Sequence, residues 1–426
     1  MTKPGDRVKI ITSEQELEGV LMPEEKEFIV LKMDTGYNIG IDKKRVKEIA
    51  LISHPPERET ELPKTQPKTG LPKISILHTG GTIASKVDYT TGGVVAQFEP
   101  EKLIEMFPEL RNIANIESRL VRNIMSENIR FAHYNIIAHE IKKEIENGSE
   151  GIIITHGTDT IHYTAAALSF MLKDLGVPVI LVGAQRSSDR GSSDAALNLL
   201  SAALFITASK NFAEVAVCMH ETKEDTTCLI LPGTKCRKMH SSRRDAFKAI
   251  NTEPWARVDF KAKKVDYLKT GFNERKAGVP EIREFKENLE VGIIKTYPNM
   301  FADIFQSYKK YDGLIIEGTG LGHIPIMEID ELTKEHTSIY NSVKELIAND
   351  VIVTLTTQCI YGEIDMNVYS PGRKLLDAGV LGNYCDMTTE TAFIKLAWLL
   401  SNYPKHEVKK LYSVNLVGEI SKRLEK

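Results

Sequence analysis

Short apolar runs alternate with amphipathic segments along most of this chain. The runs rich in β-branched residues predict buried strands, and apolar residues spaced three or four apart predict helices that pack on them. Alternation of strands and helices predicts a parallel sheet with right-handed crossover connections. In this first α/β domain, strands are expected at residues 73–77, 151–155, 177–182 and 215–219, and helices at 135–147, 161–174 and 195–206.

The alternation restarts near Leu289 and predicts a second, smaller α/β domain, so the fold class is α/β with two lobes. Its strands are expected at residues 291–295, 313–317 and 351–355, with a helix at 390–401. We place the first domain at 73–265 and the second at 289–426. The charged segment between them, 266–288, has no clear period and is interpreted as an inter-lobe connection.

The first 52 residues follow a different pattern. Four short apolar runs separated by turn residues predict a small β-barrel at 1–52. A unit of this size has little core, so we expect it to dock elsewhere as an interaction module; a passive extension is the alternative. A proline-rich linker at 53–72 follows, because proline favours an extended chain.

Composition narrows the classes of function. The chain has 426 residues, 42% of them hydrophobic and 27% charged, with a net charge of −3. A dedicated nucleic-acid binder would normally be basic, although a subunit whose partner binds nucleic acid remains compatible. The five cysteines contain no CxxC pair, so zinc and redox-pair sites are not expected. Because no signal peptide and no apolar run of about 18 residues is visible, we expect a cytoplasmic protein.

The first predicted strand of the body ends in a glycine-rich loop at 78–85, His-Thr-Gly-Gly-Thr-Ile-Ala-Ser. The two glycines leave backbone N–H groups uncovered, and Thr79 and Thr82 offer hydroxyls. Such a loop suits acyl transfer, in which a hydroxyl attacks and amides bind the oxyanion. The alternatives are an ordinary turn and a phosphate cradle, although neither GxGxxG nor GxxxxGK[ST] is present.

A second polar loop, His-Gly-Thr-Asp-Thr at 156–160, follows the second predicted strand. Ligands of parallel sheets bind beyond the carboxyl ends of the strands, so both loops should lie at the same edge. Asp159 could otherwise cap the following helix. The nearby histidines lack metal-ligand spacing, and we interpret His78, His156 and His162 as structural.

The segments 79–84 and 154–160 together resemble the paired signatures of the bacterial-type asparaginase/glutaminase family. The similarity covers residues 73–426, and its two long motifs occur in the family's order. The stretch from Thr356 to Thr388 is similar to the cytoplasmic branch of that family.

The barrel and linker ahead of such a body resemble the archaeal Glu-tRNA(Gln) amidotransferase D subunits, as do the segments 183–190 and 238–245. The resemblance implies a glutaminase that supplies ammonia to a partner E subunit. That partner would bind ATP and magnesium and convert Glu-tRNA(Gln) to Gln-tRNA(Gln), while this chain would need no cofactor. It also implies a homodimer, within a D2E2 heterotetramer.

The same resemblance implies roles for single residues. Thr82 matches the family nucleophile, and Thr158, Asp159 and Lys238 match the second catalytic set; no metal ligand is implied. These residue types fit amide hydrolysis through an acyl-enzyme. Lys238 could accept the hydroxyl proton through Thr158 if burial and neighbouring cations keep its amine neutral. Asp159 could hold Lys238, bind the α-ammonium of glutamine, or do both.

Further positions match residues that bind the substrate in relatives. They are Ser126 and Glu127 in one loop, Tyr89 on a mobile flap, and Asn299 near the substrate ammonium. Glu127 stands where some relatives carry glutamine. The acid that the second lobe contributes is Glu363 or Asp365. Without the resemblance, all of these are ordinary cap and turn residues.

Two alternatives to the amidotransferase subunit stay open, a free-standing cytoplasmic asparaginase and a catalytically inactive scaffold. The extension at 1–72 disfavours the first, and the intact catalytic set disfavours the second. Lys238 is part of a basic run that also contains Lys235, Arg237, Arg243 and Arg244. Two interpretations of this run stay open, a solvated loop or a surface for tRNA phosphates.

Overall fold

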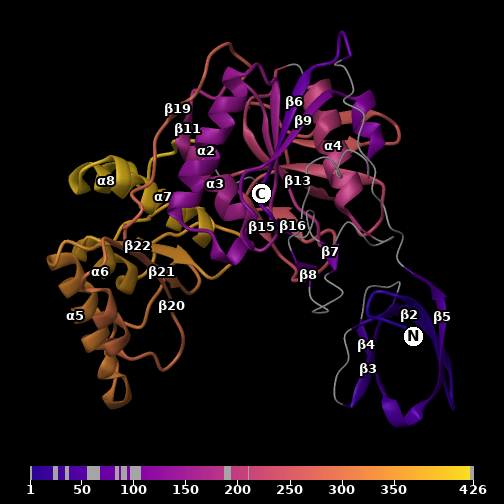
Figure 1. Ribbon diagram of the computed structural model, residues 1–426. Helices are drawn as coiled ribbons and strands as arrows, with labels where there is room; N and C mark the ends of the chain where they lie inside the picture. Colours follow the sequence, from indigo (N-terminus) through magenta and orange to yellow (C-terminus); the bar gives the residue numbers. More distant parts are fainter. Residues whose placement is uncertain are drawn as a thin grey trace.

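The computed structural model describes most of the chain and shows three larger sheets, of which the two in the body have helices packed on them (Figure 1). In the described part, no helix combines the length and the apolar character needed to cross a bilayer. The residues described are 2–22, 27–33, 38–54, 68–81, 86–87, 94–95, 107–186, 193–209 and 211–422.

The N-terminal unit is a five-stranded antiparallel sheet in the order β4-β3-β2-β1-β5. Alternate residues of β1 are buried, so Val8 and Ile10 pack with Leu31 in a small apolar core. This is the small β-rich unit that the sequence predicts; most of the predicted linker lies outside the described residues. The strands are β1 (Arg7–Thr12), β2 (Glu16–Leu21), β3 (Phe28–Lys32), β4 (Asn38–Asp42) and β5 (Val46–Ser53).

An eight-stranded sheet in the order β18-β17-β14-β13-β12-β10-β6-β9 forms the first α/β domain. Its five parallel strands are β6 (Lys73–His78), β9 (Asn115–Leu120), β10 (Gly151–Thr155), β12 (Val179–Val182) and β13 (Val215–His220). Three strands that we did not predict run antiparallel at one end: β14 (Thr227–Pro232), β17 (Ala256–Asp259) and β18 (Lys264–Tyr267). The sheet is therefore mixed and not wholly parallel, because a short connection and not a helical crossover follows β13.

Helices cover both faces of this sheet (Figure 1). On β10, Ile152 and Ile154 face the core shared with α2 (Phe131–Glu146) and α3 (Ile161–Met171), whereas Ile153 faces the core shared with α4 (Ala195–Ala208). This strict alternation follows from the two-residue period of a strand. Helix α3 ends three residues before the predicted end, because the next two residues, β11 (Leu172–Lys173), pair with β19 (Glu281–Ile282).

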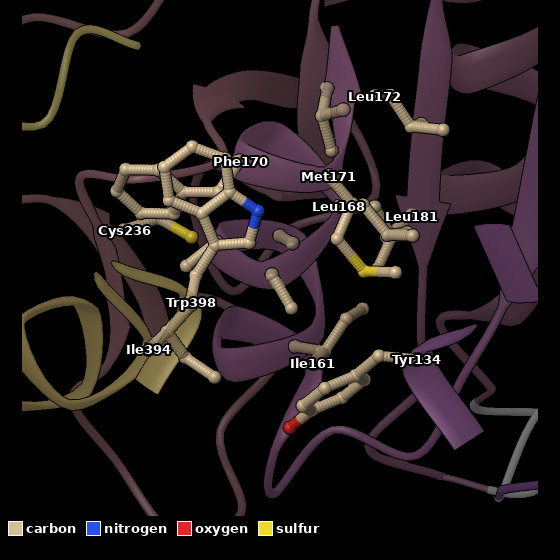
Figure 2. Close-up of a cluster of buried hydrophobic side chains, with 14 of the residues drawn as sticks. Tyr134, Ile161, Leu168, Phe170, Met171, Leu172, Leu181, Cys236, Ile394 and Trp398 are labelled. Atoms are coloured by element: carbon tan, nitrogen blue, oxygen red, sulfur yellow. The ribbon is translucent and has the colours of Figure 1, made fainter. Parts of the chain in front are cut away.

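The second domain has three parallel strands, β20 (Val291–Lys295), β21 (Gly313–Gly318) and β22 (Ile352–Thr357). Its helix α7 packs on α3 of the first domain, where the rings of Trp398 and Phe170 lie 5.5 Å apart (Figure 2). The two domains therefore share one buried apolar cluster. The helices of the second domain are α5 (Glu335–Ala348), α6 (Ser370–Ala378), α7 (Thr389–Asn402) and α8 (Lys405–Leu411).

Candidate active site

The two glycine-containing loops leave neighbouring parallel strands and begin side by side. In the register of β6 and β10, His78 is opposite Thr155. The backbone N–H and the hydroxyl of Thr79 both donate to the carbonyl oxygen of Thr155, at 3.1 and 2.9 Å. The prediction that both loops lie at the same sheet edge is confirmed.

Glycines allow the loops to touch through their backbones. Gly81 has φ of +81°, and a Cβ there would lie 2.4 Å from the backbone nitrogen of Gly157. A Cβ on Gly80, whose φ is +108°, would lie 2.4 Å from the carbonyl oxygen of Ile124. A side chain at either position would meet a neighbouring backbone and adopt a strained φ. Three segments therefore converge here, around residues 80, 124 and 157.

Lys238 lies at this convergence and joins the second loop to a separate strand pair. It ends β15 (Cys236–Lys238), which pairs with β16 (Phe247–Ala249). The Lys238 Nζ donates to Thr158 Oγ1 at 2.8 Å and to Asp159 Oδ1 at 2.7 Å. The side chain of Lys238 is 10% exposed, whereas that of Asp159 is 68% exposed. The structure thus brings together three of the four residues of the expected catalytic set.

The fourth, Thr82, lies outside the described residues, as does Tyr89. The described chain stops at Gly81, the residue that precedes Thr82 and lies against Gly157. The assignment of Thr82 as nucleophile therefore stays a prediction.

Ser126 lies beside the second loop. A Cβ added to Gly157 would come within 2.8 Å of Ser126 Oγ, and the Thr160 hydroxyl donates to the Ser126 carbonyl at 2.7 Å. Ser126 is buried, whereas its neighbour Glu127 points to solvent from the same short 3-10 turn. Ser126 therefore lies against Gly157 of the second loop.

The residues expected from the second domain are not joined to Lys238. Among the described residues, no hydrogen bond or ion pair links Asn299, Glu363 or Asp365 to the Lys238 group. Asn299 is exposed in a turn after β20, with φ of +62°. Glu363 and Asp365 are half-buried in the segment after β22. Within one chain, the site is therefore assembled on the first domain.

The three histidines near the loops are buried, and hydrogen bonds hold two of them, His78 and His156. Burial lowers the pKa of His78 to about 3 and that of His156 to about 4. His156 donates through Nδ1 to the Gly157 carbonyl and accepts from the Thr164 hydroxyl through Nε2. Burial likewise lowers the pKa of His162 to about 3. All three are neutral near pH 7, which favours the structural interpretation over acid–base chemistry.

The basic run around Lys238 has acidic partners and is not a free cationic surface. Lys235 is buried and bonds to Asp386 Oδ2 at 2.5 Å, and Arg237 pairs with Glu390 at 3.1 Å. The two remaining arginines of the run pair with aspartates of their own domain: Arg243 with Asp245, and Arg244 with Asp225. Lys235 is therefore not part of a solvated loop, whereas residues 239–243 are exposed, and a surface for tRNA phosphates there stays a prediction.

Sequence reasoning missed the role of the second domain behind Lys238. Asp386 and Glu390 lie just before and at the start of α7, about 150 residues after the strand that they contact. Contacts at that separation leave no periodic signal in the sequence. The stretch Lys-Cys-Arg-Lys at 235–238 has one apolar residue among three basic ones, so it does not show the alternation that predicts a strand.

Comparison with known proteins covers nearly the whole chain. Residues 73–271 match the family "Asparaginase, N-terminal", residues 290–411 match "Glutaminase/Asparaginase C-terminal domain", and residues 2–52 match "GatD N-terminal domain". The chain is 45% identical over 430 residues to the glutamyl-tRNA(Gln) amidotransferase D subunit of Methanococcus maripaludis strain C7, covering 99% of this chain and 98% of that protein. It is 44% identical to the corresponding subunit of Pyrococcus furiosus, covering 98% and 94%.

Solved structures of asparaginases have the same fold as the body of the chain. The thermostable L-asparaginase from Thermococcus kodakarensis superposes with a TM-score of 0.70 at 30% identity, covering 82% of this chain and 100% of that one. L-asparaginase I from Vibrio cholerae gives a TM-score of 0.69 at 27% identity, covering 83% and 100%.

Proposed function

The chain belongs to the family of glutamyl-tRNA(Gln) amidotransferase D subunits, and on this premise we propose that it hydrolyses glutamine through a threonine acyl-enzyme and delivers the ammonia to a partner subunit. Membership in this family makes the chain a subunit of the amidotransferase with an asparaginase-type domain. One observation carries the proposed chemistry: the Lys238 Nζ lies within hydrogen-bond distance of Thr158 Oγ1, beside the loop that leads into Thr82.

In the first half-reaction, the Thr82 Oγ attacks the side-chain amide carbon of glutamine and a C–O bond forms. The hydroxyl proton passes through Thr158 to the Lys238 amine and is returned to the leaving nitrogen. The C–N bond then breaks and ammonia leaves, which yields a γ-glutamyl ester on Thr82. Backbone N–H groups of the glycine loop are suited to stabilise the oxyanion, and one such donor typically contributes about 2.7–4 kcal/mol.

In the second half-reaction, water attacks the ester, its proton follows the same route, and glutamate leaves with the Thr82 hydroxyl restored. Asp159 has two uses that its geometry supports. One oxygen bonds Lys238, and the carboxylate is 68% exposed, so it also faces solvent from which the α-ammonium of glutamine arrives. Ser126, Glu127, Tyr89 and Asn299 are proposed to bind the remainder of the substrate, together with Glu363 or Asp365.

We also propose the finer assembly that family membership suggests. An E subunit in the cytoplasm would use ATP and magnesium to activate Glu-tRNA(Gln), and two copies of each subunit would form a D2E2 heterotetramer. The N-terminal unit at 2–52 matches a family named for D subunits, and the asparaginase structures superpose on only 82–83% of this chain. That difference favours the amidotransferase role over a free-standing asparaginase.

Ammonia release from glutamine and asparagine should be measured with and without the E subunit and Glu-tRNA(Gln). We expect Thr82→Val to abolish release from glutamine with an unchanged circular dichroism spectrum, and Thr82→Ser, which keeps a hydroxyl, to retain measurable turnover. Activity in Thr82→Val would show that another residue is the nucleophile. If the isolated chain hydrolyses asparagine at full rate and binds no E subunit, the amidotransferase role fails.

A further inference from the structure

The strand that carries Lys238 is not part of the main sheet. In the described part of the chain, β15 pairs with the three-residue strand β16 and with no other strand. Two strands of this length are marginal without other support. Other contacts must therefore support β15, whose last residue, Lys238, lies where the loops at 79–81 and 156–160 meet.

On one side, the segment that leads into β15 borders open space. A cavity of about 750 Å³ separates residues 232–235 from residues 415–418. On that side the first domain also contacts the segment, since the Gly233 N–H donates to the Val215 carbonyl at 3.1 Å.

On the other side, the second domain holds the segment through the residues 386–391, which we name the α7 anchor. The Thr391 hydroxyl donates to the Thr234 carbonyl at 2.8 Å. Asp386 pairs with buried Lys235 at 2.5 Å. Cys236 belongs to the buried cluster that contains Ile394 and Trp398 of α7 (Figure 2).

Of the contacts made by the α7 anchor, the one from Glu390 reaches Arg237, the residue that directly precedes Lys238. Glu390 lies in the first turn of α7, it is 7% exposed, and one of its oxygens pairs with Arg237 at 3.1 Å. His162 Nε2 lies 3.9 Å from the same oxygen, but burial keeps that imidazole neutral. Among the described residues, Arg237 is thus the charged partner of Glu390. A buried carboxylate with a single cationic partner holds that partner firmly, because separation would leave the Glu390 charge buried without compensation.

We propose that the α7 anchor positions Lys238, and that Glu390 is a positioning residue that acts through Arg237 on the adjacent lysine. The inference rests on the proposed function, in which Lys238 transfers the proton. The anchor fixes residues 234, 235 and 237 from the second domain, so the Lys238 Nζ stays within reach of Thr158. This gives the second domain a part in catalysis that does not require any of its side chains to touch the substrate.

A double-mutant cycle tests the proposal on the full chain, in complex with its E subunit. We expect Glu390→Gln to lower kcat for ammonia release from glutamine at least tenfold, with KM changed less than about threefold, since substrate-binding groups are untouched. In a Lys238→Ala background, the same substitution should change kcat less than about twofold, because a residue that acts only through Lys238 has nothing left to position.

Glu345→Gln is the matched control, since it removes one carboxylate charge from the same domain at a surface pair with Lys309. It should leave kcat unchanged. If Glu390→Gln does not fold, Thr391→Val replaces it in the cycle, because it removes the hydroxyl that donates to the Thr234 carbonyl and accepts from the Thr388 hydroxyl.

Equal losses of kcat in the two backgrounds, or an unchanged kcat in the otherwise wild-type chain, would overturn the inference and leave the proposed function intact. A wild-type complex that releases no ammonia from glutamine would overturn the proposed function, and the inference with it.

Discussion

A methyl group added at Gly81 should push the two loops of the active site apart. Gly81→Ala places a Cβ 2.4 Å from the backbone nitrogen of Gly157, where ordinary contact begins at 3.4 Å. Relief of the clash therefore requires the loops to separate by about 1 Å, which is enough to lower the rate of a positioned reaction about 100-fold. The positive φ adds about 1–2 kcal/mol of backbone strain.

Gly148→Ala is a control with nearly the same strain and no clash. Gly148 has φ of +84°, against +81° for Gly81, and a Cβ there would meet nothing within 4 Å. Both variants should melt a few degrees lower than wild type by circular dichroism. Only Gly81→Ala should lose ammonia release from glutamine, measured under saturating substrate. If the two variants differ in kcat by less than threefold, the close approach of the loops does not matter for catalysis.

Two further predictions concern stability. Acid should destabilise the first domain as the pH falls below about 6.5, because the unfolded chain then binds protons that three buried imidazoles, with folded pKa values of about 3, 4 and 3, cannot take up. Between pH 7 and pH 5 the loss is about 2 kcal/mol for each imidazole and about 6 kcal/mol in all. Chemical unfolding at both pH values measures it, and a flat profile would contradict the pKa values of His78, His156 and His162. Separately, Glu419→Ala should cost about 3–5 kcal/mol, since it leaves the fully buried Lys395 ammonium uncompensated. Lys395→Met combined with Glu419→Leu should recover the part of that loss caused by the ammonium, but not the part caused by the Leu416 and Val417 N–H groups that donate to Glu419; a double variant no more stable than Glu419→Ala would show that the unpaired ammonium is not a cause of the loss.

The local pattern of apolar residues was sufficient to predict the two strands that position the loops at 78–85 and 156–160. The β-branched run at 151–155 and the apolar run at 73–77 predicted two strands, and the rule for parallel sheets placed their loops together. The antiparallel strands β14, β17 and β18 were missed because strand direction depends on how the connections fold, which has no local signature. The family resemblance, and not composition or spacing, selected Thr82 over Thr79 as the predicted nucleophile.

The contacts that anchor the segment around Lys238 could not be predicted from the sequence for a different reason. Arg237 and Lys235 resemble surface charges in the sequence, because the carboxylates that neutralise them come from the other domain. Burial of charge is decided by tertiary contacts, and a sequence window around residues 235–238 contains none of them.

The long separation between β15 and its anchors has a consequence for the order in which the protein matures. A ribosome delivers Lys235 and Lys238 well before Asp386, 151 residues after the first of them. Domains fold largely as they emerge, so the first domain can collapse while the polar contacts from α7 do not yet exist. A partly synthesised chain of this kind would contain Lys238 without the contacts from α7. If Lys238 acts as proposed, nascent subunits would hydrolyse glutamine poorly, and little ammonia would be released by unfinished molecules.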